Sequence, residues 1–560
     1  MPIKLIVKNK EFVFPWSRDI VDVLRKFAKF NIETKTWYAE DIPCWAKKYL
    51  SIDIECYDIK WWRNYGYLNT QDDTITKIIL KHTCYRLKKW KQVTCDEYCT
   101  TLSCIQRCRQ EKWRPAKQVE EEICLAKKTD LDKWAIPRGL VMRVVKEINS
   151  HVPNFVNLNE LEIDSRLRDY QIEVARKLWE QLRKTGSGVI QMATGAGKSY
   201  LAGYLAKQLI KNGFNVFMVA LQLDLVYQLK KFAEQFGVKD GVYAITVQTL
   251  YRRLFNKDIV NDIENENNND EDIEIIKAYA DEMTNIDIDI VDIFRRRNTA
   301  LILDEVHHLP ARTVKAIAME TGDGWGLRIG MSATPWRNDG RDLEIYAVMG
   351  DIVGGISSSF LIKHGFAVPV EIRVVEAPGC LNVDEIDGTN NAVTYAAIKK
   401  AIAKCESRNK FIAELAQNAE KPVIVITQLI NHANELAKIM RSIGIRAEAV
   451  TGVVRGDIRQ TIYRKLENGI IDAIVATQLA DEGLDLPPLR TMIIAIGGKS
   501  KTRTLQRIGR IVRPYPGKTS AVVYELLDRD VKFFEDHLYE RIELYKTESM
   551  WKIIWKQNSR

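Results

Sequence analysis

The chain has 560 residues, which at about 150 residues per domain predicts three or four domain-sized units. Hydrophobic residues make up 46% of the sequence and charged residues 28%, a balance that excludes a chain disordered throughout. The formal net charge of +9 is a mild excess, which is compatible with a polyanionic partner but does not identify one.

The beginning of the chain and its apolar runs bear on where the protein acts. The first residues, MPIKLIVKNKEFVF, lack the long apolar segment and small-residue cleavage site of a secretory signal. We find no apolar run of about 18 residues, so we expect no membrane span. The expectation is a protein that is neither secreted nor bound to a membrane.

The N-terminal region, residues 1–155, is rich in cysteine and tryptophan. Segments Ile3–Val7 and Glu11–Phe14 predict a β-hairpin, followed by a helix over Ser17–Phe30. Between Lys81 and Lys117, basic residues are interleaved with aromatic ones. This pattern suits neutralisation of a phosphate backbone and stacking on bases. It fits equally well a solvated basic helical face whose aromatic residues lie in the core.

Four cysteines in this stretch have a regular spacing: Cys95, Cys99, Cys104 and Cys108. On a helix, the two members of each pair would share one face, so four thiolates arranged in this way could bind Zn²⁺ or an iron–sulfur cluster. Disulfides across a helical hairpin and unliganded thiols are the alternatives. Ten cysteines in a chain of this length argue against a disulfide scaffold, and the isolated Cys380 and Cys405 are expected to be packing residues.

A glycine-containing loop follows the first strongly apolar strand, Val189–Met192, and precedes a helix over Leu201–Lys211. The loop consists of Ala193, Thr194, Gly195, Ala196, Gly197, Lys198 and Ser199. Glycines allow backbone N–H groups to surround phosphate oxygens. The lysine can reach the β and γ phosphates, and the serine hydroxyl can bind Mg²⁺. The sequence therefore predicts a nucleotide phosphate site here.

An acidic segment interrupts this part of the chain. Residues 256–292 contain 13 acidic residues and two lysines. We expect a solvated surface insertion, partly helical around Ile273–Met283.

Two carboxylates end the buried strand that follows. Asp304 can hold Mg²⁺ through the water shell of the ion. Glu305 can accept a proton from the water that attacks the γ-phosphate.

Short apolar strands alternate with amphipathic helices in two successive runs, which predicts parallel sheets covered on both faces. The first run has strands Val189–Met192, Val216–Leu221, Ala244–Val247, Ala300–Leu303 and Leu327–Gly330. The second has Val423–Ile426, Ala447–Val450, Ala473–Ala476, Met492–Ile496 and Ala521–Glu525. The tail, Asp528–Arg560, reads as amphipathic helix. The predicted fold class is α/β, with two tandem parallel-sheet domains after an N-terminal α+β accessory region.

Six segments, in order, resemble the motifs of superfamily 2 helicases. They are Leu167–Gln171 (the Q motif), Ala193–Ser199 (motif I), Asp304–His307 (motif II), Ser332–Thr334 (motif III), Thr477–Asp485 (motif V) and Gln506–Arg513 (motif VI). Motifs II and III look most like those of the XPB group and next like the phage UvsW type. The resemblance covers residues 160–520 and implies two RecA-like lobes.

The resemblance also implies roles for individual residues. Gln171 would sense adenine, and Gly483 and Asp485 would contact the ribose and the interlobe hinge. Arg510 and Arg513, three residues apart, would share one helix face and act on the γ-phosphate from the second lobe. The coupling residues would be Ser332, Ala333, Thr334 and Gln506. The residues that hold the nucleic-acid backbone would be Thr451, Gly452 and Thr477.

The resemblance therefore implies an ATP- and Mg²⁺-dependent DNA helicase or translocase, in which ATP hydrolysis between the lobes drives movement along nucleic acid. An RNA helicase of the same superfamily, and an ATP-driven clamp that does not unwind, are the alternatives. We expect an accessory region over 1–155, lobes over 156–360 and 361–530, and a C-terminal helix over 531–560. A cytoplasmic or nucleoid-associated location is expected.

Overall fold

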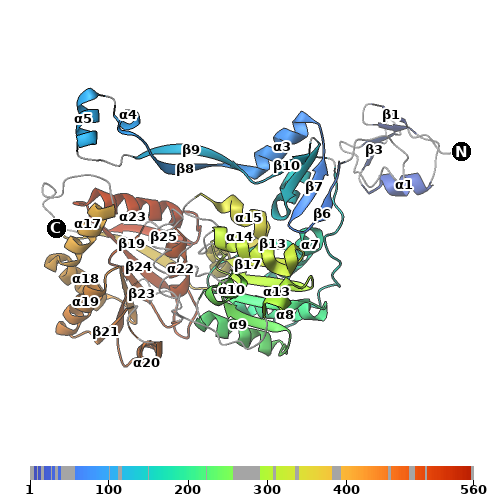
Figure 1. Cartoon of the computed structure of the whole chain (residues 1–560). Coiled ribbons are helices and arrows are strands. Elements are labelled where there is room, and N and C mark those ends of the chain that lie inside the picture. Colours follow the sequence, from blue (N-terminus) through green and yellow to red (C-terminus); the bar gives the residue numbers. More distant parts are fainter. Residues whose placement is uncertain are drawn as a thin grey trace.

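The structure of the chain is a computed structural model (Figure 1). It describes residues 6–8, 11–13, 18–26, 28–31, 36–38, 57–99, 101–110, 116–130, 132–148, 150–221, 223–255, 290–306, 311–334, 340–380, 392–451, 454, 456–477, 486–498 and 501–556. The acidic segment lies outside these residues, except for its last three. None of the helices described combines the length and the apolar character that a membrane crossing needs.

The first run of strands forms a six-stranded sheet, which we call lobe 1. The strand order is β15-β14-β16-β17-β13-β18, and each neighbouring pair is parallel. The strands are β13 (Ser187–Met192), β14 (Asn215–Ala220), β15 (Val242–Thr246), β16 (Thr299–Asp304), β17 (Leu327–Ser332) and β18 (Ile352–Ile356). The central strands are buried on both faces, as continuous apolar runs in a covered parallel sheet should be.

Helices cover both faces of this sheet (Figure 1). They are α7 (Asp169–Thr185), α8 (Lys198–Lys211), α9 (Leu223–Gln235), α10 (Val247–Phe255), α13 (Ile290–Arg295), α14 (Ala311–Glu320) and α15 (Asp342–Met349).

The second run forms lobe 2, a seven-stranded parallel sheet of order β21-β22-β20-β23-β24-β19-β25. Its strands are β19 (Val370–Glu376), β20 (Val423–Thr427), β21 (Ala447–Val450), β22 (Ala473–Thr477), β23 (Thr491–Ile494), β24 (Ala521–Leu527) and β25 (Trp551–Lys556). Its helices are α16 (Ser358–Lys363), α17 (Ala392–Ala403), α18 (Glu406–Asn418), α19 (Ile430–Ser442), α20 (Gly456–Glu467), α22 (Lys501–Ile511) and α23 (Lys532–Tyr545). The two parallel-sheet lobes confirm the predicted fold class.

The tail corrects one prediction. Among the described residues of the tail, α23 alone is helical, whereas Trp551–Lys556 forms β25 and pairs in parallel with β19. Aromatic and β-branched residues in this segment favour a strand, and the edge of the sheet offers it a partner. The C-terminal segment is therefore part of lobe 2 and not a separate helix.

The N-terminal region is α+β, as predicted. Its small first sheet has the order β1-β2-β4-β3, with β1 (Ile6–Lys8), β2 (Glu11–Val13), β3 (Lys29–Asn31) and β4 (Thr36–Tyr38). The predicted hairpin of β1 and β2 is present. The predicted helix is shorter than expected, because α1 covers only Arg18–Leu24 and Lys29–Asn31 is a strand.

A second, four-stranded antiparallel sheet has the order β10-β11-β7-β6, and we call it the accessory sheet. It comprises β6 (Lys60–Trp62), β7 (Tyr65–Asn69), β10 (Lys127–Asp130) and β11 (Lys133–Pro137), packed with helices α3 (Asp73–Thr83) and α6 (Val141–Val145). The same core includes Ala347 of α15. Arg138 donates hydrogen bonds to the carbonyls of Gly324 (3.2 Å) and Gly326 (2.8 Å). The accessory sheet is thus docked directly on lobe 1.

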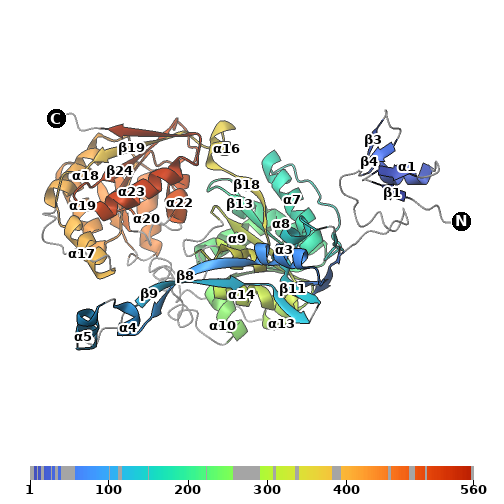
Figure 2. The same cartoon turned by 90° about the horizontal axis from the view of Figure 1, so that it is seen from above.

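A long antiparallel hairpin leaves this region, and we call it the arm. It consists of β8 (Cys84–Gln92) and β9 (Ala116–Cys124), with α4 (Cys95–Tyr98) and α5 (Leu102–Gln110) at its tip. Figures 1 and 2 show the arm running from lobe 1 in the direction of lobe 2. At its base, the Tyr85 hydroxyl donates to Glu344 in α15.

Candidate active site

The glycine loop lies at the carboxyl end of β13, where the sequence predicted it. Gly195 and Gly197 have φ values of 85° and 82°, in the left-handed region that glycine adopts without a Cβ penalty. Gly197 is also the residue before the first turn of α8. Free N–H groups at the start of a helix and in such a loop attract anions, so the local geometry fits a phosphate site.

Lys198 lies close to one of the two carboxylates predicted to act with it. Its Nζ lies 3.5 Å from Glu305 Oε1 and donates to the carbonyl of Met192 at 3.3 Å. Asp304, the last residue of β16, is 4% exposed, and its Oδ1 accepts a hydrogen bond from Glu305 N at 3.0 Å. The structure therefore brings Lys198 to the strand end that carries Asp304 and Glu305, more than 100 positions further along the sequence.

Ser332 and Thr334 lie beside this group. Ser332 ends β17, which pairs with both β13 and β16, and its Oγ accepts a hydrogen bond from Thr334 N at 2.9 Å. Thr334 is 1% exposed, and its hydroxyl has no hydrogen-bond partner among the described residues. Buried hydroxyls are usually satisfied, so this one is suited to a partner that arrives during the reaction cycle.

Gln171 holds the glycine loop from α7. Its Nε2 donates to the carbonyl of Ala196 at 3.1 Å, and the Tyr170 hydroxyl donates to the same carbonyl at 3.0 Å. The Gln171 side-chain oxygen accepts from Arg168 N at 3.0 Å. The positioning role of Tyr170 was missed at the sequence level, although its place next to Gln171 on a capped helix start was a usable signal.

Arg168 connects this corner to the segment between α16 and β19. Its guanidinium lies 4.4 Å from the ring centroid of Phe366, within the range of a cation–π contact. Val368 N, two residues further, donates to the carbonyl of Val512 in lobe 2 at 2.8 Å. The loop-holding helix of lobe 1 is thus linked to lobe 2.

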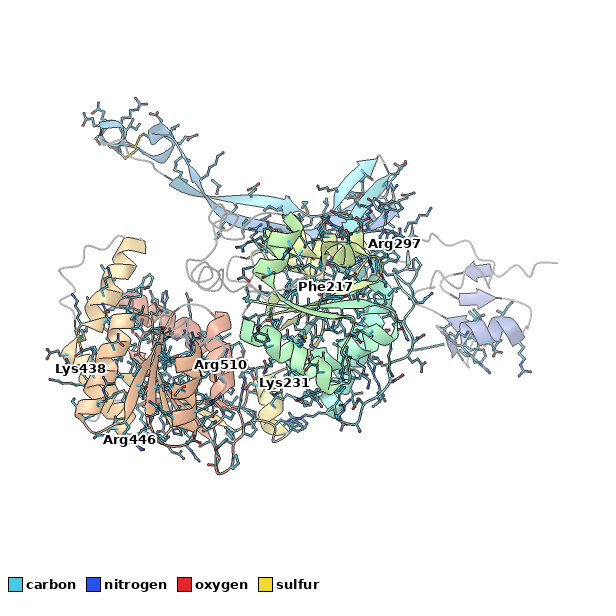
Figure 3. All side chains as sticks on the ribbon, turned by 60° about the horizontal axis from the view of Figure 1, so that its bottom comes forward. Phe217, Lys231, Arg297, Lys438, Arg446 and Arg510 are labelled. Atoms are coloured by element: carbon cyan, nitrogen blue, oxygen red, sulfur yellow. A yellow bond between two sulfur atoms is a disulfide. The ribbon has the colours of Figure 1, made fainter. Side chains whose placement is uncertain are left out.

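The end of α22 packs on the glycine loop itself. A Cβ atom built on Gly509 would lie 2.6 Å from Thr194 Cβ, and one built on Gly195 would lie 3.7 Å from Arg513 Cγ. The missing side chain at Gly509 is therefore what allows motif VI to approach motif I so closely. Figure 3 shows Arg510 on the side of lobe 2 that faces lobe 1.

One detail of the arginine pair is wrong in the sequence-based account. Helix α22 ends at Ile511, so Arg510 and Arg513 do not share a helical face. Pro514 follows Arg513, and a residue before proline disfavours the helical conformation. Arg513 instead lies against the glycine loop, where burial lowers the pKa of its guanidinium.

The nucleic-acid and ribose positions are only partly described. Thr451 and Thr477 are buried at 3% and 4% exposure near the carboxyl ends of β21 and β22, and the Thr477 hydroxyl has no partner among the described residues. Gly452, Gly483 and Asp485 lie outside the described residues. Gln506 belongs to α22, and Ala333 lies between the two motif III hydroxyls.

The cysteines correct a larger prediction. Cys95 is bonded to Cys108 and Cys99 to Cys104, across the α4–α5 hairpin at the tip of the arm. Sulfurs paired in this way cannot serve as thiolate ligands, so the predicted Zn²⁺ or iron–sulfur site is wrong and the alternative of disulfides across a helical hairpin is confirmed. Two further disulfides within the described part of the chain join Cys84 to Cys124 and Cys380 to Cys405. The expectations of no disulfide scaffold and of isolated packing cysteines are therefore also wrong.

The basic stretch of residues 81–117 runs from the end of α3 through strand β8 and the tip helices α4 and α5 to the start of β9. Arg86 is paired in register with Glu122, and Lys88 with Glu120. These neighbours balance much of the positive charge near the base of the arm. The stretch is thus part strand and part helix, and both interpretations of it, nucleic-acid binding and a solvated basic helical face, stay predictions.

Two family models match the chain. Residues 164–337 match the model described as "Type III restriction enzyme, res subunit", and residues 406–515 match "Helicase conserved C-terminal domain". The matched ranges contain the loop, carboxylate and arginine positions described above.

Named relatives agree with these models. The chain is 27% identical over 532 residues to "Putative helicase 22" of Sulfolobus islandicus filamentous virus, covering 90% of each protein. It is 28% identical over 247 residues to "DNA 3'-5' helicase XPB" of Kineococcus radiotolerans, covering 43% of this chain and 42% of that one. It is 25% identical over 231 residues to "ATP-dependent DNA helicase uvsW" of Enterobacteria phage T4, covering 40% and 45%. The latter two matches thus span less than half of each relative. Together with the site geometry, these similarities identify the chain as a superfamily 2 helicase that resembles the XPB and UvsW group.

Proposed function

We propose that the chain couples ATP hydrolysis to movement along DNA, as a helicase or translocase. The observation that carries the proposal is the contact between the lobes: motif VI of lobe 2 lies on the phosphate loop of lobe 1, with Gly509 against Thr194. An ATP site completed by both lobes makes the state of the nucleotide and the arrangement of the lobes depend on each other.

The residues around the loop fit ATP with Mg²⁺. Lys198 would bind the β and γ phosphates, and Ser199 and Asp304 would hold the ion, which neutralises charge on the phosphates when bound. Glu305 would orient the attacking water and accept its proton. Because Lys198 Nζ and Glu305 Oε1 are 3.5 Å apart, beyond ordinary hydrogen-bond distance, a phosphate oxygen can compete for the lysine.

Arg510 and Arg513 would act from lobe 2. A guanidinium on the γ-phosphate stabilises the charge that develops during transfer, an effect of about 10³–10⁵ in rate where arginine fingers have been measured. Hydrolysis would remove the contact between the guanidinium and the γ-phosphate and allow the lobes to separate. If each lobe holds the nucleic-acid backbone, repeated closing and opening becomes stepping along a strand.

DNA is the proposed substrate, because the XPB and uvsW relatives are named as DNA helicases. Residues 1–155 would form an accessory nucleic-acid-binding region, and 156–360 and 361–530 the two motor lobes, the second of which continues to Lys556. Such an enzyme would work in the cytoplasm or with the nucleoid.

The nucleic-acid dependence of ATP turnover tests this proposal. We expect double-stranded or single-stranded DNA to raise the turnover well above the rate without nucleic acid, and Lys198→Ala to abolish it. The variant Lys438→Ala, on the exposed surface of α19, is the control and should turn over normally. Stimulation by RNA alone would contradict the choice of DNA, and turnover unchanged by any nucleic acid would contradict the motor.

A further inference from the structure

We propose that the outer face of the accessory sheet and the adjoining rim of lobe 1 form a second binding surface for single-stranded nucleic acid, separate from the motor. We call it the platform, and its residues are Lys60, Trp62, Tyr67, Lys133, Arg297 and Trp325. The inference rests on the proposed function only in taking nucleic acid as the partner.

Strand register places four of these residues on one face of the accessory sheet. Lys60 pairs with Tyr67, so both side chains project from the same face. Trp62 lies two positions from Lys60 on β6 and therefore shares that face. Lys133 on β11 pairs with Asn69, two positions from Tyr67. The residues between them, such as Trp61 and Leu68, point the other way into the core.

Aromatic and cationic groups are already matched on this face. Lys133 Nζ lies 5.0 Å above the centroid of the Tyr67 ring. Trp62 is 59% exposed, which is unusual for the largest apolar side chain in a protein. An exposed aromatic beside lysines is the combination by which proteins hold single strands, through stacking and backbone neutralisation.

The aromatic surface continues onto lobe 1. The Trp62 and Trp325 rings meet edge to face at 6.0 Å, and Trp325 stacks on Phe155 at 5.9 Å. The Arg297 guanidinium lies 4.9 Å from the Trp325 ring. Figure 3 shows Arg297 on the side of lobe 1 next to the accessory sheet. Because two parts of the chain build this surface, it depends on their docking.

The charge of the rim favours a polyanion. Arg296 and Arg297 are exposed, and no ion pair is described for either among the residues that the structure describes. Arg63, next to Trp62, does pair with Asp323 at 3.0 Å. More than half of the Asp323 side chain is exposed to water. Exposed pairs contribute little, so a phosphate can replace the carboxylate.

The platform is distinct from the site between the lobes. Arg297 precedes β16 and Trp325 precedes β17, at the amino ends of the strands. Asp304 and Ser332 lie at their carboxyl ends. Each of these strands has six residues, which separate its two ends by about 17 Å. A nucleic acid that reached both places would be held at two points.

Binding of a 40-nucleotide oligo-dT, and of an abasic oligonucleotide of the same length, to the full chain without nucleotide tests the inference. Trp62→Ala should weaken oligo-dT binding at least about five-fold, since stacking of one base contributes that much, and should leave abasic binding unchanged. Trp62→Phe should bind oligo-dT like the wild type. Arg297→Ala should weaken the binding of both oligonucleotides. All three variants should keep wild-type ATP turnover at saturating DNA.

Matched controls are Trp555→Ala, an exposed tryptophan on β25 that is 48% exposed, and Lys438→Ala on α19. Neither should change the affinity for either oligonucleotide. Oligo-dT binding by Trp62→Ala that equals the wild type, or equal losses for oligo-dT and a DNA duplex, would overturn the platform. Failure of the wild-type chain to bind any nucleic acid would instead overturn the proposed function.

Discussion

At Glu305 the backbone conformation is as informative as the side chain. Its φ of 46° lies in the left-handed region, which costs a non-glycine residue about 1–3 kcal/mol and persists mostly where function requires it. The strained turn directs the carboxylate toward Lys198 at the phosphate loop. Glycine would relieve the strain but would remove the base.

Replacement of Glu305 by glutamine separates binding from chemistry. Glu305→Gln keeps the size of the side chain but cannot accept the proton of the attacking water, so ATP turnover should fall by about 10²–10⁴-fold while ATP binding persists. A fluorescent ATP analogue measures binding, and phosphate release measures turnover. Glu173→Gln on the exposed face of α7 is the control. Normal turnover in Glu305→Gln would show that another group is the base.

His432 predicts how the stability of lobe 2 depends on pH. Its ring nitrogens make two hydrogen bonds, Nδ1 with Thr427 Oγ1 at 2.7 Å and Nε2 with Asn409 Oδ1 at 2.9 Å. Burial, with the nearby charge of Arg408, lowers its pKa to about 3. Below pH 6.5 this histidine binds a proton in the unfolded chain but stays neutral in the folded chain until the pH approaches 3. Stability should therefore fall as the pH falls from 6.5 toward 3, by up to about 1.4 kcal/mol per pH unit.

Urea unfolding of lobe 2 between pH 5 and 8, with amide exchange in β20 as the readout, measures this effect. His432→Asn should flatten the pH dependence, whereas His364→Gln, at an exposed position, should not. A wild-type unfolding midpoint that stays constant from pH 7 to 5 would contradict a neutral buried ring.

At the scale of elements, the strands and helices that could be predicted from the sequence are those with a clear local pattern. The strands β13, β16, β20 and β22 were predictable because each is a continuous apolar run that a covered sheet requires. The loop and carboxylate positions followed, because they sit where those strands end. Strand β25 was missed since its partner, β19, is about 180 positions away and no local pattern reveals it.

The cysteines show the same limit. Their i, i+4 spacing describes one helix face, but the chain turns between α4 and α5 and places Cys95 opposite Cys108. Whether such cysteines can bind a metal or form disulfides depends on how the chain folds back in three dimensions, which the spacing alone does not show. Four disulfides among the described residues are uncommon inside cells, with proteins of hyperthermophiles as the known exception.

Reduction should loosen the arm without stopping the motor. An isolated two-stranded hairpin is marginally stable in water, and here disulfides close it at the base, between Cys84 and Cys124, and at the tip. We expect a reductant to speed amide exchange in β8 and β9 by at least about ten-fold, while β13 and β16 remain protected. The same measurement on Cys84→Ser/Cys124→Ser isolates the basal disulfide. Equal protection of the arm before and after reduction would contradict this role.

At the scale of the whole molecule, the two lobes meet at a glycine. A Cβ on Gly509 would lie 2.6 Å from Thr194 Cβ, a distance that forces one side to move. Gly509→Ala should therefore hold the lobes apart and lower DNA-stimulated turnover by about 10-fold or more, with ATP binding to lobe 1 less affected. Gly355→Ala is the matched control, because its added Cβ would meet only the side chain of Gln191, with Oε1 at 3.6 Å. Wild-type turnover in Gly509→Ala would show that this approach is dispensable.

The charge distribution also becomes clearer for the whole molecule. The net charge of +9 includes the acidic segment 256–292, with 13 acidic residues and two lysines. The rest of the chain is therefore much more basic than the total suggests. A basic body suits a protein that holds a phosphate backbone, and the docked accessory sheet adds a second cationic surface to the two lobes.

Triplex displacement tests the central claim, that ATP hydrolysis between the lobes drives movement along DNA. A third strand bound to a DNA duplex is released when a motor moves beneath it, without any need for unwinding. We predict ATP-dependent release by the wild-type chain, and no release by Lys198→Ala or Glu305→Gln. DNA-stimulated ATP turnover without displacement of a triplex or of a paired strand would contradict movement and indicate an ATP-driven clamp.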